Sequence, residues 1–381
     1  MGSDRLEALV VGAGIAGVCV ALRLLEAGVP ADALALVDPE GVPLARWWRL
    51  AGAVEMRSMR SPALHHLDRA DESLLAFAHA LGRPLGARTP PPLDLFAAHT
   101  AAVVGRAGLA ARTLRAAATG LRPDGGGWTV ATDRGPLWAR RVVLALGGGE
   151  RPDWPDWART LRARGGSVAH VFEVGFRPRT EGRLAVVGGG LSGAQVVLAA
   201  VARGQPAVWS VRRPPVVSRL DADAGWFTGE ALLGYHRLAD PVARRRCLDR
   251  SRRRGSVPRA VAARLEAAVD AGRVRILAAP VRAVAHQGAL RLWCGDERVD
   301  VDHLVLATGF ARGAPGRSWL APAAAALGLP RAPCGFPVPD PRLAWAPGLS
   351  VTGALAELEL GAAARAIAGA RRGAALIGGR V

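Results

Sequence analysis

Short apolar runs, glycine-rich turns and helix-periodic segments alternate at the start of this chain. Leu6–Val11 is a short apolar run that predicts a buried strand, and a turn with three glycines follows it. Ile15–Glu26 has the apolar spacing of a helix, and Ala33–Val37 is a second apolar run of strand length. This order predicts a βαβ unit, in which the helix connects two parallel strands.

The same order recurs in the middle of the chain. Leu184–Val187 predicts a strand, Gly188–Gly193 a glycine turn, Ala194–Ala202 a helix, and Ala207–Val211 a second strand. The recurrence predicts two structural units built on one plan.

Each unit then changes from helical to alternating periodicity. Leu114–Arg140 and Val281–Val301 alternate apolar and polar residues between turn signals, which is typical of a β-meander. A buried strand follows each meander, at Val142–Leu146 and at Leu304–Ala307. The predicted fold class is therefore α/β, with two three-layer, Rossmann-like units that each carry a β-meander.

Other segments are less regular. Pro39–Pro62 is rich in Trp, Arg and Met, and we expect an irregular segment in which Trp47 and Trp48 either line a ligand pocket or pack on the core. Arg151–Arg179 is rich in Trp and Pro and predicts a linker. Further helical patterns occur at Ser73–Leu81, Leu93–Ala107 and Gly361–Arg371.

The charge of the chain does not by itself indicate nucleic-acid binding. Its 381 residues have a formal charge of +18, but the sequence contains no Lys and no Asn, which indicates a GC-rich coding sequence. The arginines are scattered, apart from a run between Ala243 and Arg254. For that run we expect a solvated helix face; the alternatives are an anion-binding surface or a partner surface.

Cysteine spacing and hydropathy indicate the cellular location of the protein. Cys19, Cys247, Cys294 and Cys334 lie far apart, so neither a redox pair nor a zinc site is expected. The first apolar run leads directly into the glycine turn without a signal-peptide pattern, and no charge-free stretch has membrane-spanning length. We expect a soluble, cytoplasmic protein without a metal, a membrane partner or a nucleic-acid partner.

The first glycine turn has the pattern of a dinucleotide-binding loop. Gly12 suits the tight turn, Gly14 lets the backbone approach a pyrophosphate, and Gly17 allows close packing of the helix on the strand. The helix N-terminus then faces the phosphates with its positive end. Asp38, at the end of the second strand, is in the place where a carboxylate accepts the ribose hydroxyls. An adenine dinucleotide is therefore expected here.

The second glycine turn is followed by positively charged residues where the first unit has an acidic one. Gly188, Gly190 and Gly193 repeat the spacing of the first turn, but Arg212 and Arg213 follow the second strand where an acid would stand. Arginine there selects the 2′-phosphate of NADPH over the free hydroxyl of NADH. The alternative is that these are two more of the many surface arginines.

The paired turns, the segment Ala307–Phe310 and the tail Val351–Leu358 together resemble the two-dinucleotide-binding oxidoreductases. Within them the chain is most similar to class B flavin-dependent monooxygenases, nearest to the lysine/ornithine N-hydroxylase-like branch. The linker motif of the monooxygenases is only partly met at Gly166–His170, where His170 has either a linker role or an ordinary packing role.

The resemblance implies a domain division and an activity. It implies an FAD domain at 1–175 and 300–381, with an NADPH domain at 176–299 inserted into it. It implies that NADPH reduces FAD and that one oxygen atom of O2 is then transferred to a nucleophilic N, S or carbonyl carbon of a small-molecule substrate. The alternative is an FAD-dependent NADPH reductase that passes electrons to a quinone, a metal or a protein. A non-catalytic redox sensor would leave the second turn unexplained.

The candidate site residues follow from the motifs and the resemblance. The candidates for contact with the flavin ring or the substrate are Trp48, Met56, Arg57 and His65. The alternative for His65 and His66 is that they cap a helix. The Gly361–Arg371 helix is expected to direct its positive end at the flavin ring. The expected cofactor-binding residues are Gly12, Gly14, Ile15, Ala16, Gly17, Asp38, Pro39, Trp47, Trp48, Met56, Arg57, Leu146, Gly147, Gly188, Gly190, Leu191, Ser192, Gly193, Gln195, Arg212, Arg213, Thr308, Gly309, Phe310, Gly353 and Leu358.

Overall fold

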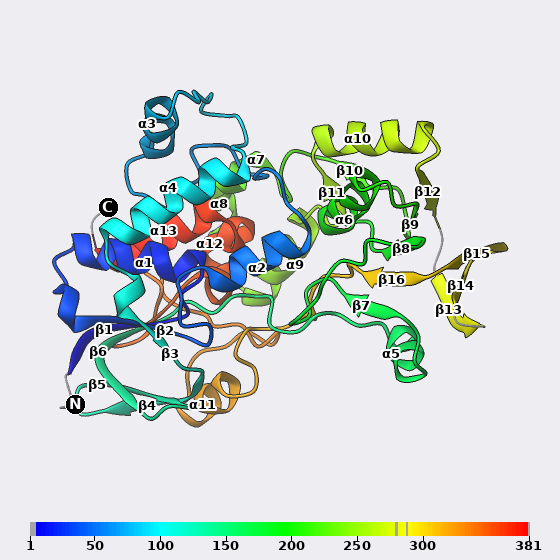
Figure 1. Cartoon of the computed structure of the whole chain (residues 1–381). Coiled ribbons are helices and arrows are strands. Elements are labelled where there is room, and N and C mark those ends of the chain that lie inside the picture. The colour runs from blue at the N-terminus through cyan, green and yellow to red at the C-terminus, as the bar shows by residue number, and fades with distance from the viewer. Residues whose placement is uncertain (1–4, 279–280, 287–288, 380–381) are drawn as a thin grey trace.

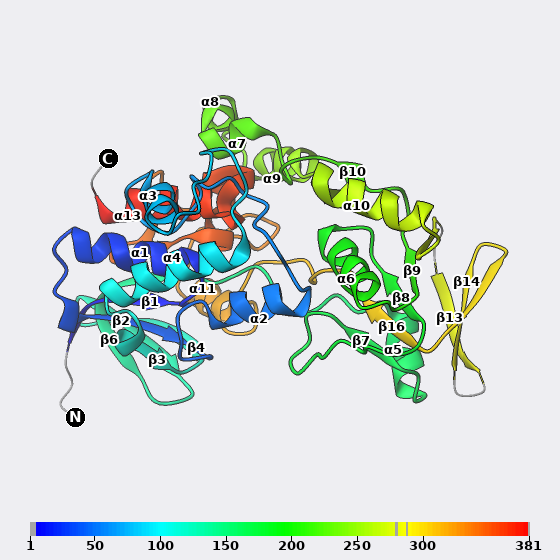
Figure 2. The ribbon, with the colours of Figure 1, turned by 45° about the horizontal axis from the view of Figure 1, so that its top comes forward.

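A computed structural model of the chain describes residues 5–278, 281–286 and 289–379. The chain forms two lobes (Figure 1). The first lobe contains both ends of the described chain, and the second is built from its middle. Figure 2 shows the same division after a turn of the molecule, with α7, α8 and α9 at the top of the first lobe and α10 at the top of the second.

The bounds of the elements are as follows. The strands are β1 (Leu6–Val11), β2 (Leu34–Asp38), β3 (Thr113–Arg115), β4 (Ala118–Asp124), β5 (Gly127–Thr132), β6 (Leu137–Leu144), β7 (Val168–His170), β8 (Leu184–Val187), β9 (Ala207–Ser210), β10 (Val216–Val217), β11 (Ser256–Val257), β12 (Val274–Leu277), β13 (Val281–His286), β14 (Ala289–Cys294), β15 (Glu297–Val301), β16 (His303–Leu306), β17 (Ala344–Ala346) and β18 (Leu349–Val351). The helices are α1 (Ile15–Glu26), α2 (Ala45–Ala53), α3 (Ser73–Ala80), α4 (Leu93–Arg106), α5 (Asp156–Ala163), α6 (Leu191–Ala202), α7 (Ala224–Thr228), α8 (Glu230–Tyr235), α9 (Pro241–Ser251), α10 (Arg259–Asp270), α11 (Leu320–Ala326), α12 (Glu357–Leu360) and α13 (Ile367–Gly378). Short 3-10 turns are η1 (Ala31–Ala33), η2 (Ala110–Arg112), η3 (Gly353–Ala356) and η4 (Gly361–Arg365).

The first lobe is built on a sheet with the order β17-β18-β6-β1-β2-β3. β1 pairs in parallel with both β2 and β6, so the carboxyl ends of these strands meet at one edge. Helices α1 and α13 pack against each other over the sheet, because their small residues Gly17, Ala21, Ala370 and Ala374 are buried. The hairpin of β4 and β5 extends from β6 as the predicted meander.

The second lobe repeats this plan on a smaller scale. Its parallel sheet has the order β12-β9-β8-β16-β7, and α6 and α10 lie together on one side of it. Antiparallel strands β13, β14 and β15 form the second predicted meander. Strands β7 and β16 belong to this sheet although they lie outside the range 176–299 expected for the second unit.

An excursion of the second lobe returns to the first. Helices α7, α8 and α9 follow β10 and carry Trp226, Tyr235 and Leu248, which are buried against Phe336 and Leu358 of the C-terminal part. This apolar cluster joins the two lobes away from the glycine turns.

The Arg-rich run has a different role from the one expected. The prediction of a solvated helix face is wrong for part of α9, because Arg244 pairs with Glu359 at 2.7 Å and Arg252 pairs with Glu357 at 2.5 Å. Arg245 also pairs with Glu357, whose side chain is fully buried. These arginines therefore serve an internal ion-pair network between α9 and α12.

Three local predictions also need correction. The irregular segment after Asp38 contains helix α2, and the expected linker 151–179 contains α5 and β7. The helix expected from Gly361 starts instead at Ile367, because the chain turns at Gly361 (φ +74°) and forms only a 3-10 turn before Ala366. In the described part of the chain no helix is long and apolar enough to cross a membrane.

Candidate dinucleotide-binding site

The first glycine turn lies at the carboxyl ends of β1 and β6. Gly12 has φ +108°, and a Cβ atom there would lie 2.7 Å from the carbonyl oxygen of Ala145. A Cβ atom on Gly17 would lie 1.8 Å from the carbonyl oxygen of Gly12. Both positions therefore require glycine for backbone reasons, as the motif predicts.

Gly14 is different, because a Cβ atom there would meet no protein atom within 4 Å. It is the N-cap of α1, and no side chain caps this helix end. The first amides of the 12-residue helix therefore border open space, with the positive end of the helix dipole behind them. A Cβ atom at Gly14 would fill that space, so the turn fits a diphosphate group.

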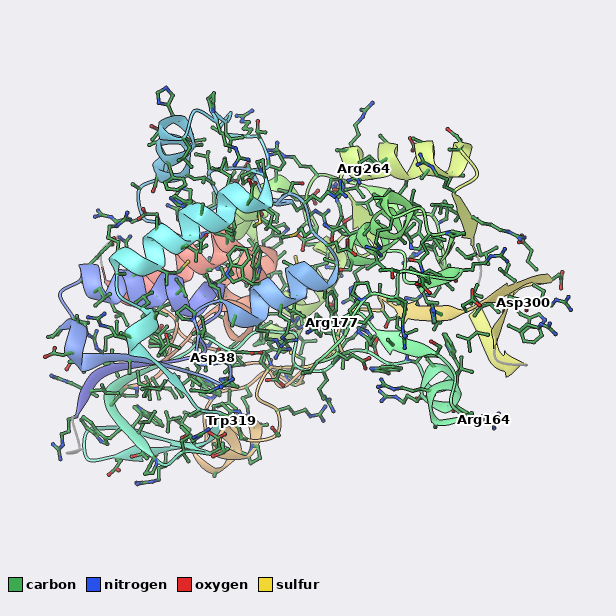
Figure 3. All side chains as sticks on the ribbon, viewed as in Figure 1. Asp38, Arg164, Arg177, Arg264, Asp300 and Trp319 are labelled. Atoms are coloured by element: carbon green, nitrogen blue, oxygen red, sulfur yellow. The ribbon has the colours of Figure 1, made fainter. Side chains whose placement is uncertain are left out.

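The Asp38 carboxylate accepts hydrogen bonds from backbone amides of the glycine turn and of the segment after β2. Its Oδ2 accepts a hydrogen bond from the Ala13 amide and its Oδ1 accepts one from the Glu40 amide, each at 2.9 Å. Figure 3 labels Asp38, which ends β2 and is half-buried. Pro39 follows and is exposed. The carboxylate thus lies beside the glycine turn, where the ribose hydroxyls are expected, and retains lone pairs for them.

Two further segments converge on the same edge. Leu146 and Gly147 follow β6 and are half-buried and exposed, respectively. Gly353 follows β18 with φ +58°, and a Cβ atom there would lie 3.0 Å from Cβ of Ala16 in the first turn of α1. The half-buried Ile15 precedes Ala16. These predicted residues from three parts of the sequence therefore do meet.

Helix α2 is attached to the first turn. The Leu44 amide donates to the carbonyl of Ala13 at 2.8 Å, and the Arg46 guanidinium donates to the Gly149 carbonyl. Trp47 and Trp48 form an edge-to-face pair with ring centroids 4.6 Å apart. Both contact the buried Phe96, at 5.7 and 6.2 Å between centroids, so packing on the core is part of their role.

The remaining flavin-ring candidates differ in burial and in the apolar cluster to which they belong. Met56 is half-buried between the cores of the two lobes, and Arg57 is exposed. Leu358 is 1% exposed and lies in the cluster around Trp226, whereas Trp47 packs in the core beneath α1. Leu358 and the tryptophan pair therefore belong to different apolar clusters, and their contact with the flavin ring stays a prediction.

The two neighbouring histidines have different surroundings. His65 is half-buried and stacks on Phe227 at 6.0 Å between ring centroids, and burial lowers its pKa to about 4. His66 is fully buried, and its Nε2 lies 2.9 Å from the Asp71 carbonyl, which therefore accepts from it. Of the two, only His65 lines an open pocket.

The second glycine turn reproduces the first. Gly188 has φ +134°, and a Cβ atom there would lie 2.4 Å from the carbonyl oxygen of Ala307. A Cβ atom on Gly193 would lie 2.1 Å from the Gly188 carbonyl oxygen, whereas one on Gly190 would meet nothing within 4 Å. Both lobes thus present an uncapped helix N-terminus at the carboxyl edge of a parallel sheet.

Residues around the second turn carry positive charge. Arg212 and Arg213 are exposed and follow β9, and the Arg213 carbonyl would lie 3.6 Å from a Cβ atom on Gly189. The segment therefore folds close to the glycine turn. Half-buried Leu191, Ser192 and Gln195 lie in the first two turns of α6.

The chain passes between the lobes at two segments, around Asp153 and around Gly309, and these segments contact each other. The Asp153 amide donates to the Gly309 carbonyl at 3.0 Å, and Phe310 stacks on Phe172 with ring centroids 4.8 Å apart. Thr308 donates to the Asp153 carbonyl and therefore accepts from Nε2 of His170 at 3.1 Å. His170 is fully buried, and burial lowers its pKa to about 4. It thus supports the crossing in its neutral form.

Sequence reasoning missed Arg60. Its guanidinium donates to the carbonyls of Arg219 and Ser218, at 2.9 and 3.1 Å, and to Oγ of Ser256 at 2.8 Å. Arg60 belongs to the first lobe and these acceptors to the second, so it connects the lobes. Nothing local in the sequence distinguishes it from the other arginines.

Comparisons with known proteins agree with this architecture. Residues 9–149 match the model of a family described as FAD-NAD(P)-binding. No curated protein sequence matches the chain.

Solved structures resemble the whole chain at low sequence identity. An ornithine N-hydroxylase of Kutzneria sp. 744, in a complex with reduced FAD, NADP+ and L-ornithine, is 20% identical over 98% of both chains with a TM-score of 0.74. The reduced form of ornithine hydroxylase from Pseudomonas aeruginosa is 17% identical over 98% of both chains with a TM-score of 0.75. Bacillithiol disulfide reductase from Bacillus cereus is 17% identical over 98% of both chains with a TM-score of 0.62. The chain therefore has the two-lobed α/β fold of these flavoproteins, and residues 9–149 of its first lobe match an FAD-NAD(P)-binding family.

Proposed function

We propose that the chain is an FAD- and NADPH-dependent monooxygenase that transfers one oxygen atom from O2 to a nucleophilic atom of a small molecule. The observation that carries the proposal is the duplicated glycine turn, open at Gly14 and at Gly190. Two such turns in one chain serve two dinucleotides. The N-hydroxylating enzymes resemble the chain more closely, with TM-scores of 0.74 and 0.75, than the disulfide reductase does, with 0.62.

FAD is assigned to the first lobe. The amides at the start of α1 bind its diphosphate, and Asp38 accepts from its ribose hydroxyls. Gly147 and Gly353 leave room for the part of FAD that extends toward the second lobe. The domain division at about 1–175, 176–299 and 300–381 remains part of this proposal, with β7 and β16 counted in the second unit.

NADPH is assigned to the second lobe. The amides at the start of α6 bind its diphosphate, and Arg212 and Arg213 pair with its 2′-phosphate. When bound, the two cofactors supply hydride transfer and O2 activation. The protein's own part is to hold them in position and to exclude water from the space between the lobes.

A dithiol mechanism does not suit this chain. Among the cysteines whose side chains the structure describes, Cys19 lies in α1, Cys247 in α9 and Cys334 in a turn, and all three are free thiols. Burial raises the pKa of Cys19 to about 12, so it does not supply a thiolate near neutral pH. Free cysteines also support the proposed cytoplasmic location. A reductase that uses a quinone, metal or protein acceptor is the alternative outcome of the test.

The test follows NADPH oxidation and hydrogen peroxide release by the FAD-loaded chain. For a monooxygenase, a substrate amine such as ornithine or lysine, or a sulfide, raises NADPH oxidation in air and lowers the peroxide released per NADPH. It has no effect without O2. If quinones accelerate NADPH oxidation equally with and without O2, and no amine or sulfide changes the peroxide yield, the proposal is wrong and the chain is a reductase.

A further inference from the structure

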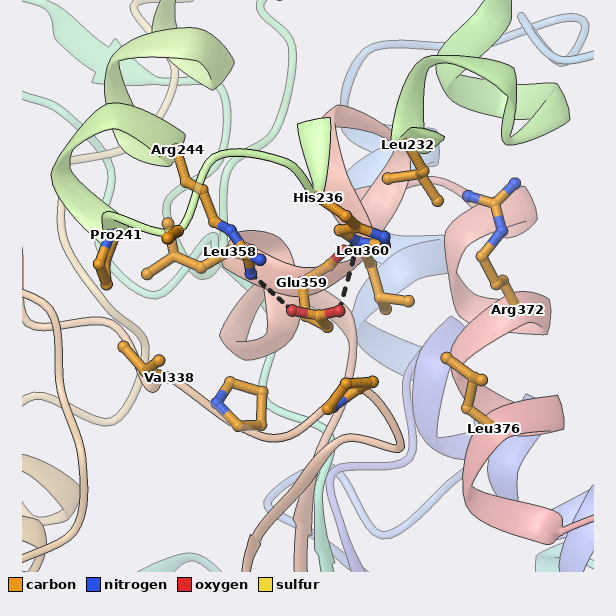
Figure 4. A pocket seen from close by; sticks show the side chains of 13 residues that line it. Leu232, His236, Pro241, Arg244, Val338, Leu358, Glu359, Leu360, Arg372 and Leu376 are labelled. Carbon is orange, nitrogen blue, oxygen red and sulfur yellow. Dashed lines mark hydrogen bonds and ion pairs between the residues drawn. The ribbon is translucent and has the colours of Figure 1, made fainter. Parts of the chain in front are cut away.

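A pocket lies outside both glycine turns, between the C-terminal segment and the α7–α9 excursion. It has a volume of about 500 Å³, which is within the usual range for small-molecule sites. Figure 4 shows its walls, which come from α8, α9, the 338–341 segment, α12 and α13. The lining residues are Leu232, His236, Ala239, Pro241, Arg244, Val338, Pro339, Pro341, Leu358, Glu359, Leu360, Arg372 and Leu376.

Most of the lining is hydrocarbon. Leu232, Leu358 and Leu360 are at most 9% exposed, and Val338 and Leu376 extend the apolar wall (Figure 4). A ligand without a sizeable apolar part would leave this surface in contact with water. The pocket therefore suits a molecule with a hydrocarbon body.

One carboxylate of the lining is already paired. The Glu359 side chain is 8% exposed, and Arg244 contacts its Oε2 at 2.7 Å. Nε2 of His236 lies 3.3 Å from its Oε1 (Figure 4). The negative charge of Glu359 is thus balanced within the protein, and it offers little attraction to a ligand amine.

Arg372 is the cation that remains unbalanced. Its guanidinium donates to the carbonyls of Trp226 and Phe227, at 3.4 and 3.2 Å. Within the described residues it has no carboxylate at ion-pair distance, and burial lowers the pKa of Arg372 below its ordinary value. A half-buried guanidinium with only two long contacts to neutral oxygens retains donors for an anion.

We propose that this pocket binds a small amphipathic carboxylate, with its carboxylate on Arg372 and its hydrocarbon body on Leu232, Leu360 and Leu376. The pocket favours an anionic ligand, because the positive charge of Arg372 has no carboxylate partner whereas the negative charge of Glu359 is paired. The apolar wall selects its body. This binding is separate from the proposed oxygenation, since neither glycine turn lines the pocket.

The probe is decanoate, titrated calorimetrically into the full-length, FAD-loaded chain. Decylamine and decanol carry the same body with a cationic or a neutral head, and acetate carries the head without the body. We expect decanoate to bind at least about tenfold more tightly than each of these. Decylamine and decanol lack the charge-assisted contact with Arg372, and acetate lacks the apolar contact.

Two variants separate the head from the body. Arg372→Met removes the charge and keeps the bulk, and Leu376→Trp fills the apolar part of the pocket and keeps the arginine. Each should weaken decanoate binding about tenfold or more. The matched control is Arg264→Met on α10, an exposed arginine in the second lobe (Figure 3), which should leave binding unchanged.

The outcomes decide the proposal. Undetectable decanoate binding, equal binding of decylamine or decanol, or full binding by either pocket variant would each overturn it. Because calorimetry reports binding and not turnover, a failed oxygenation assay does not affect this result. Melting curves of each variant with FAD show whether a loss of binding reflects unfolding instead, and Leu376→Trp tests the pocket if Arg372→Met does not fold.

Discussion

Glu357 offers a direct test of how the excursion is held on the first lobe. Its side chain is fully buried, and it pairs with Arg245 of α9, with Arg252 directly after α9, and with Arg365 at 2.8 Å. The Glu357→Gln substitution keeps the shape but removes the charge, which leaves three guanidinium groups around a neutral amide. Those groups then repel one another in a poorly solvated site.

The size of the effect follows from burial. Breaking a buried ion pair from one side costs about 3–5 kcal/mol. The three arginine side chains keep 16%, 17% and 39% exposure, and water therefore reduces the cost. We expect a loss of about 3 kcal/mol, which lowers the Tm of a lobe of this size by roughly 6–12 °C.

The pH dependence has a definite sign. Burial alone would raise the pKa of Glu357, but Arg365, Arg252 and Arg245 outweigh burial and hold the pKa below its ordinary value of 4.5. A carboxylate with a depressed pKa stabilises the folded state above its unfolded pKa, and this stability disappears as the pH falls through the folded pKa. The difference in stability between wild type and Glu357→Gln should therefore be largest near neutral pH and shrink below about pH 4.5.

The measurement is denaturant unfolding of the FAD-loaded chain at pH 7 and at pH 4. Asp249→Asn is the matched control, because it breaks an ion pair with Arg254 that is about half exposed at both partners and should cost less than about 0.5 kcal/mol. If Glu357→Gln costs no more than the control, or the same at both pH values, the reasoning is refuted.

Three further predictions concern the cofactors and the lobes. Gly14→Val should melt like the wild-type chain stripped of FAD but fail to bind FAD, because its side chain fills only open space; a fully yellow variant would contradict this. Replacing Arg212 and Arg213 with Ala should raise the KM for NADPH about tenfold or more and leave that for NADH unchanged, as steady-state kinetics with both nucleotides would show. Arg60→Met should speed hydrogen exchange at 216–220, since three contacts between the lobes are lost; unchanged exchange would argue against that role.

Local patterns predicted well the two units that carry the glycine turns. β1, α1 and β8 have the predicted bounds, and β13, β14 and β15 lie within the range predicted for the second meander. These elements are short, buried and bounded by glycine, so hydrophobic periodicity and turn chemistry both point to the same structure. The three glycines of each turn were also assigned to distinct backbone roles that the geometry bears out at Gly12 and Gly17.

Patterns failed where distant segments decide the conformation. α2 forms in a segment of mixed composition because the Leu44 amide and Arg46 attach it to the first turn and the Trp pair packs on Phe96. The arginines of α9 read as a solvated face because their partners, Glu357 and Glu359, lie more than 100 residues away in sequence.

The sequence by itself determined the α/β class, the two glycine turns and the strands that carry them, because these depend on neighbours within one turn or one strand. Only the tertiary structure decided which arginines are paired, that Leu358 and Trp47 pack in different apolar clusters, and that Arg372 borders a pocket whose carboxylate, Glu359, is already paired with Arg244. Charge balance and pocket shape depend on contacts between segments that are distant in sequence, and a local pattern of residue types does not specify those contacts.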